Sequence, residues 1–112
     1  MKLVETCRDT VKIVTVPEER IDAAAAIRFK ESMRAATAEG PAHVILDLSN
    51  VAFVDSSGLG AIVSVMKLMG ADRRLDLAGL TPDVAKVFRL TRMDTVFVIH
   101  DHVAESVGRE TG

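Results

Sequence analysis

The chain has 112 residues, of which 48% are hydrophobic and 27% charged, and its formal net charge at pH 7 is −2. This composition is typical of one globular domain and excludes a disordered chain, and the slight negative charge and the lack of Trp and Tyr argue against nucleic-acid binding. No apolar run is long enough to span a membrane and residues 1–5 do not form a signal peptide, so we expect a cytoplasmic protein without membrane insertion.

Cys7 is the only cysteine, which argues against a disulfide or a cysteine-based metal site. It falls in a predicted strand, where we expect it to be buried as a small hydrophobic residue. His100 and His102 flank Asp101, but two alternating side chains do not supply the three protein ligands of a zinc site. We therefore expect neither a metal nor a cofactor.

The first half of the chain predicts a hairpin, a helix and a strand. Residues 3–7 and 11–16 are β-rich runs separated by a short polar turn. Asp22 can cap a helix that ends at Gly40-Pro41, and residues 44–48 form a buried strand. The helix should turn four residues toward the core: Ala26, Phe29, Met33 and Ala36.

The second half alternates helices and strands. A helix starts near residue 57 and ends before Gly70, with an apolar stripe made of Leu59, Ile62, Val63 and Met66. Residues 75–78 predict the fourth strand. Thr81-Pro82-Asp83 combines a cap, a first-turn proline and an acid at the positive end of a helix that turns Val84, Val87 and Phe88 inward.

Residues 96–99 complete the pattern as a fifth strand, and Asp101 can cap a final short helix carrying Val103, Ala104 and Val107. The element order is ββαβαβαβα. This order predicts a single α/β domain in which a mixed four- to five-stranded sheet packs with about four helices. We expect the domain to cover residues 1–108 and residues 109–112 to form a C-terminal tail.

The junction around Asp55 and Ser56 is the most informative stretch. These residues lie where a strand ends and a helix starts, a position that favours side-chain oxygens able to accept the first helical N–H groups. Gly58 and Gly60 leave the first turn bare, so the backbone of another molecule could approach closely. The loop therefore presents a serine hydroxyl with little in front of it.

Three chemistries could use that hydroxyl. A hydrolase nucleophile needs Gly-x-Ser-x-Gly, which is missing here, and no spacing ties His43, His100 or His102 to Ser56. Nucleotide binding needs a third glycine where Val63 stands. Phosphorylation of Ser56 or Ser57 fits the exposed helix start, but so does a purely structural cap. From the residues alone, phosphorylation of a serine and a purely structural cap both stay open.

The sequence resembles the anti-sigma-factor antagonists, the bacterial single-domain members of the STAS family. The resemblance covers nearly the whole chain. Its parts are Arg20-Ile21-Asp22-Ala23-Ala24, Val44-Ile45-Leu46-Asp47-Leu48, Val54-Asp55-Ser56-Ser57-Gly58-Leu59-Gly60, Leu77-Ala78-Gly79-Leu80-Thr81-Pro82 and Leu90-Thr91-Arg92-Met93-Asp94.

The resemblance implies a regulator rather than an enzyme. In its unphosphorylated form such a protein binds an anti-sigma factor that is a serine kinase and thereby releases a sigma factor. The kinase phosphorylates the serine that corresponds to Ser56, which ends the interaction, and a serine phosphatase reverses the step. The match implies a partner-binding surface made of Asp22, Asp55, Ser57, Gly58, Leu59 and Gly60.

Two positions depart from the family pattern. Glu19-Arg20 precede Ile21-Asp22 where a glycine is frequent, which could alter partner specificity, and Arg92 replaces a common glycine, which should cost a little turn stability. The alternative function is a kinase-independent STAS scaffold subunit of a stress-signalling or lipid-transport complex.

Overall fold

The computed structural model describes residues 1–103 and shows a five-stranded mixed sheet with the order β1-β2-β4-β6-β7. β1 and β2 form the predicted antiparallel hairpin, and the remaining neighbours are parallel. The strands span Val4–Arg8, Val11–Thr15, His43–Asp47, Arg74–Ala78 and Ile99–His100 in that order. The predicted α/β class and mixed sheet are thus confirmed.

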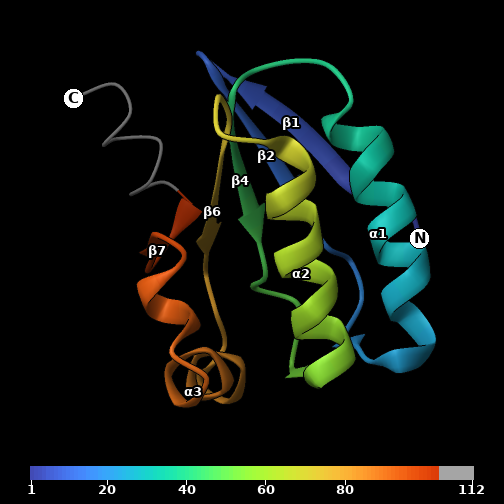
Figure 1. Ribbon diagram of the computed structural model, residues 1–112, viewed down its shortest axis with the longest axis vertical. Helices are drawn as coiled ribbons and strands as arrows, with labels where there is room; N and C mark the ends of the chain where they lie inside the picture. The colour runs from blue at the N-terminus through green and yellow to red at the C-terminus, as the bar shows by residue number, and fades with distance from the viewer. Residues whose placement is uncertain (104–112) are drawn as a thin grey trace.

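Two long helices cover one face of this sheet. α1 (Ala23–Thr37) and α2 (Ser56–Met69) run side by side and begin at the same end of the molecule, while α3 (Pro82–Leu90) lies across that end (Figure 1). The predicted inward face of α1 is confirmed, because Ala26, Phe29, Met33 and Ala36 are all buried. They pack with Ile62 and Val65 of α2 against the central strands.

The sequence did not predict a second, two-stranded sheet. β3 (Arg20–Ile21) pairs in parallel with β5 (Phe53–Val54), next to the starts of the two long helices. The carbonyl of Glu19 accepts hydrogen bonds from the N–H groups of Ala52 and Phe53, at 2.7 and 3.1 Å. Elements of two residues leave too short a pattern for periodicity to reveal.

Several predicted boundaries were wrong. α1 ends at Thr37, three residues before Gly40. Lys12 Nζ donates to the carbonyl of Ala36 at 2.7 Å, and Arg73 donates to that of Thr37, so distant side chains satisfy the last turn. Thr81 precedes α3 as predicted, but its hydroxyl donates to the carbonyl of Val51 at 2.7 Å instead of capping the helix.

The final strand is also shifted. Residues 93–95 form a 3-10 helix, and Val96 and Phe97 donate their N–H groups to Met93. The strand therefore starts at Ile99 rather than Val96. Residues 1–103 contain three α-helices, and the predicted fourth helix after Asp101 lies largely outside the described residues, as does the predicted tail at 109–112.

Cys7 is exposed, contrary to the prediction of a buried residue. It belongs to β1, an edge strand whose five residues are all exposed. Arg92, in contrast, has the left-handed backbone expected of a glycine position, with φ 59°. No helix within residues 1–103 is both long and apolar enough to cross a membrane.

Candidate functional site

The small β3–β5 sheet brings the two predicted helix caps together. Its register pairs Arg20 with Phe53 and Ile21 with Val54, so the next residues along the two strands, Asp22 and Asp55, follow side by side. Each then caps the helix that it precedes. Residues more than thirty positions apart thus form one edge, at which both α1 and α2 begin.

Asp55 links the two helices through its two carboxylate oxygens. Oδ1 accepts the N–H of Gly58 at 2.9 Å, which caps α2. Oδ2 accepts the N–H of Ala23 at 3.1 Å, which belongs to the first turn of α1. Because both acceptors belong to one side chain, the start of α2 is held in place relative to the start of α1.

Asp22 is the second anchor of this edge. Its Oδ1 accepts the N–H of Ala25 at 3.1 Å, and Arg20 Nε donates to its Oδ2 at 3.3 Å. The hydrogen bond from Arg20, followed by the one from Ala25, lowers the pKa of the Asp22 carboxyl. It therefore remains ionised and accepting at neutral pH.

Arg20 is a site residue for which sequence reasoning assigned no contact. Its guanidinium also lies over the ring of Phe53, 4.2 Å from the centroid, in a cation–π contact. The Arg20-x-Asp22 spacing was the available signal, since alternate residues of a strand share a face. The partner ring comes from β5, which the sequence did not predict.

Ser56 and Ser57, the first two residues of α2, are both exposed. Within residues 1–103, neither hydroxyl makes a hydrogen bond, because Asp55 rather than a serine caps the helix. The structural cap is therefore Asp55, and the oxygen of Ser56 has no capping role and is open to solvent.

The two glycines of the loop differ sharply. A Cβ built at Gly58 would stand 1.8 Å from the carbonyl oxygen of Ile21, whereas one built at Gly60 would meet nothing within 4 Å. The backbone that approaches Gly58 is thus the chain's own β3 strand. Gly60 is exposed, and only there does the bare backbone face outward. Leu59 between them is half-buried and packs against the core.

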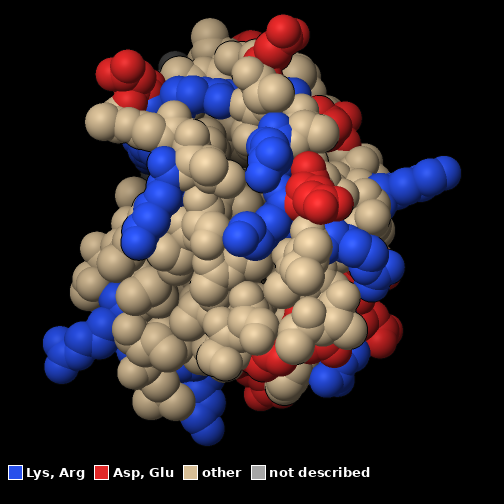
Figure 2. Space-filling view, turned by 45° about the vertical axis from the view of Figure 1, so that its right-hand side comes forward, with Lys and Arg blue, Asp and Glu red and all other residues tan. Residues whose placement is uncertain are grey.

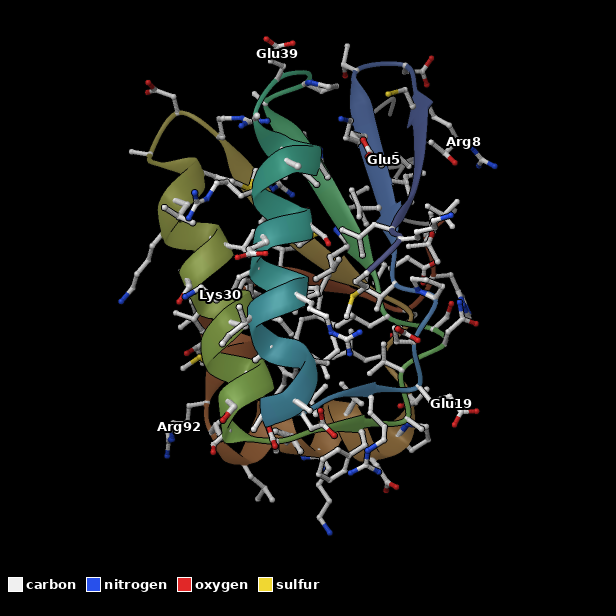
Figure 3. The ribbon with its side chains drawn as sticks, turned by 90° about the vertical axis from the view of Figure 1, so that its right-hand side faces the viewer. Glu5, Arg8, Glu19, Lys30, Glu39 and Arg92 are labelled. Carbon is white, nitrogen blue, oxygen red and sulfur yellow. The ribbon has the colours of Figure 1, made fainter. Side chains whose placement is uncertain are left out.

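Two hollows border this edge. One, of about 400 Å³, lies beside the first turn of α1 and is lined by acidic and basic side chains that include Glu18, Glu19, Arg20 and Arg28. The other, of about 370 Å³, lies between β5 and α3, with Phe53 and Leu90 exposed at its rim. Figure 3 shows Glu19 and Arg92, two departures from the family pattern, at this end of the molecule, opposite Arg8 and Glu39.

Two of the three histidines lie elsewhere, around a buried carboxylate. Asp76 of β6 is 1% exposed, and the Nε2 atoms of His43 and His100 lie 2.9 and 3.0 Å from its Oδ2. An ionised carboxylate only accepts, so both imidazoles donate. Arg74 adds two hydrogen bonds, at 2.8 and 2.7 Å. Two of the three candidate bases for Ser56 are therefore engaged with Asp76.

A family model for the STAS domain matches residues 3–106. The chain belongs to the STAS domain family. An anti-sigma-B factor antagonist from Listeria monocytogenes is 29% identical over 102 residues, which cover 90% of this chain and 90% of that protein.

Solved structures of other proteins share the STAS fold described above. A Thermotoga maritima protein, described as a candidate anti-sigma factor antagonist, has a TM-score of 0.85 and 26% identity, covering 96% of this chain and 92% of that chain. The Bacillus cell fate determinant SpoIIAA in its phosphorylated form has a TM-score of 0.68 and 18% identity, covering 96% of this chain and 98% of that chain. The latter likeness shows the fold alone.

Proposed function

We propose that this STAS domain is an anti-sigma-factor antagonist, switched off when a partner serine kinase phosphorylates Ser56. The observation that carries the proposal is the exposed, unbonded hydroxyl of Ser56 on a helix start that Asp22 and Asp55 hold in place. The similarity to the Listeria antagonist and the phosphorylated form of SpoIIAA, which shares the fold, support it.

A phosphate at Ser56 should act on binding rather than on folding. It adds about −1.5 to −2 charges at pH 7. At a helix N-terminus this charge stabilises by roughly 0.3–1 kcal/mol, so the domain stays folded. A partner acid about 6 Å away would cost ~2–3 kcal/mol per unit charge at an effective dielectric near 20, and each 1.4 kcal/mol is about tenfold in affinity.

The proposed contact surface comprises Asp22, Asp55, Ser57, Leu59 and Gly60 around Ser56, with Gly58 as support from beneath. Gly60 offers the open backbone for close approach. Asp22 and Asp55 present ordered carboxylates to the kinase. The proposed partners are the anti-sigma factor kinase and a serine phosphatase that restores the hydroxyl.

The test incubates the protein with a purified anti-sigma factor serine kinase from the same organism and ATP, and counts added phosphates by mass spectrometry. Wild type and Ser57→Ala should gain one phosphate, and Ser56→Ala none. In calorimetric titrations, Ser56→Ala should bind the kinase as wild type does, whereas Ser56→Asp and the phosphorylated protein should bind about a hundredfold more weakly.

Phosphate on Ser57 instead of Ser56 would move the switch to the neighbouring residue. Equal affinity of all Ser56 forms would remove the charge argument. Binding to a large assembly that persists without any phosphorylation would favour the alternative, a kinase-independent scaffold subunit. Circular dichroism of each variant confirms that folding is intact.

A further inference from the structure

A second surface lies between α1 and α2, on the face turned away from the sheet. Two aliphatic side chains converge there although both are largely exposed: Ile27 of α1 at 69% and Leu68 of α2 at 61%. They line a common hollow of about 140 Å³ together with Lys30 and Arg34. A cavity of roughly 150 Å³ holds a benzene-sized group, so this hollow fits one large apolar side chain.

The hollow continues along the helices into a wider, open groove. This second part has about 380 Å³ and is lined by Lys30, Arg34, Ser64, Lys67 and Leu68. Figure 3 shows Lys30 on α1, on the side that faces α2. We call the two parts together the α1–α2 groove.

The α1–α2 groove is basic although the chain carries a net charge of −2. Lys30, Arg34 and Lys67 border it, against the single acid Glu31. Within residues 1–103 none of these three cations forms an ion pair with an acid, unlike Lys12 and Arg20. Figure 2 shows Lys and Arg side chains gathered in the upper half of this face.

Charge and shape together select the occupant. Pairing of this face with its copy in a symmetric dimer would set the same cations opposite each other, which costs free energy. A membrane surface would need a broad apolar face, whereas two aliphatic residues flank a concave hollow here. An acidic segment that inserts one apolar residue satisfies both features.

We propose that the α1–α2 groove docks an acidic segment of a partner protein, anchored by one large apolar side chain between Ile27 and Leu68. The Leu68 end of the groove is remote from the proposed switch, because Leu68 lies twelve residues after Ser56, roughly 18 Å along α2. Ile27, at the other end, lies in the second turn of α1, closer to Asp22. Occupation of the groove therefore leaves the α2 start uncovered and does not depend on the phosphorylation state.

The test begins with a phage-displayed library of random peptides, selected on immobilised wild type and depleted on Leu68→Asp. Selected peptides should combine acidic residues with a large apolar one. Synthetic copies, measured by fluorescence anisotropy, should lose at least about tenfold in affinity on Ile27→Asp or Leu68→Asp. Arg34→Glu with Lys67→Glu should also weaken binding and reduce its salt dependence.

Val4→Asp and Arg89→Glu, which change exposed residues on β1 and α3, are the matched controls and should leave the affinity unchanged. Amide chemical-shift changes should map to α1 and α2, and Ser56→Asp should bind equally well. A library that yields no Leu68-dependent peptide, or only basic ones, overturns the proposal. Leu68-dependent self-association, or tighter binding to phosphatidylglycerol vesicles than to the peptides, overturns it in favour of those occupants.

Discussion

Two carboxylates in this molecule have many hydrogen bonds but opposite surroundings. Asp55 sits at a partly exposed helix start and accepts two backbone N–H groups. Asp76 lies in the buried part of β6 and accepts from three side chains. Water can replace the bonds of the first, whereas the second has no such substitute.

The two carboxylates therefore make different contributions: Asp55 fixes the geometry of the helix starts, whereas Asp76 contributes to the free energy of unfolding. Exposed hydrogen bonds contribute little net free energy but fix geometry, as at the edge that presents Ser56. Buried charges that lose their partners are strongly destabilising. Asp55 thus fixes the geometry of the helix starts where we propose the partner surface, and Asp76 supports the integrity of the sheet.

The largest effect should come from Asp76→Ala. It removes the oxygen to which the buried His43 and His100 donate from Nε2, and each buried donor left unsatisfied costs about 1–3 kcal/mol. Arg74 is half exposed, so water can solvate its guanidinium. The matched change Asp55→Ala removes a helix cap and should cost about 1 kcal/mol. Urea unfolding followed by circular dichroism measures both. Equal losses would contradict the proposed division.

The stability contributed by Asp76 should depend on pH. Burial alone would raise the pKa of Asp76, but hydrogen bonds from Arg74, His100 and His43 outweigh it and hold the pKa below its ordinary value. A lowered folded-state pKa means that the stabilisation is complete above about pH 3.9 and is lost as the pH falls through the folded-state pKa. The stability difference between wild type and Asp76→Asn should therefore shrink below about pH 3.9. A pH-independent difference would be the contrary result.

Gly58→Ala should destabilise by about 1–3 kcal/mol. The new methyl group would overlap the carbonyl of Ile21, and a backbone atom cannot rotate away as a side chain can. Thermal unfolding checks this value, and chemical shifts of β3 should move. A neutral result would show that the first turn of α2 can lift from β3 at no cost.

Gly60→Ala should have the smallest effect on stability of these variants, and it should stabilise the protein rather than destabilise it. Space is open there, and a helical alanine is favoured over glycine by about 0.5–1 kcal/mol. If the kinase approaches this backbone closely, the more stable variant should nevertheless bind it more weakly. Higher stability with unchanged kinase affinity would show that the kinase does not contact the backbone at Gly60.

Local patterns predicted much of the fold. The inward stripe of α1, the cap Asp22 and the hairpin rest on short-range spacing, and the structure confirms them. For α2 the sequence left the cap open between Asp55 and Ser56, and the structure selects Asp55. Boundaries failed where distant groups intervene, as when Lys12 and Arg73 satisfy the end of α1. A pattern of neighbours carries no information about such partners.

The same limit applies to the sites. Local pattern placed Ser56 and Ser57 at a helix start, and the resemblance to the anti-sigma-factor antagonists then selected Ser56. The convergence of His43 and His100 on Asp76 could not be predicted from the sequence, since three strands supply the residues and none has a distinctive motif. The α1–α2 groove likewise exists only once two helices lie together.

Because Asp55 accepts hydrogen bonds from both long helices, it limits how segments can be exchanged between such proteins. A chimera that imports the 49–55 loop from a relative lacking an acid at the last position would strip a hydrogen-bond acceptor from α1 as well as from α2. The loop is thus not an independent cassette. A chimera that exchanges this loop between relatives must therefore also exchange α1, which begins at Ala23.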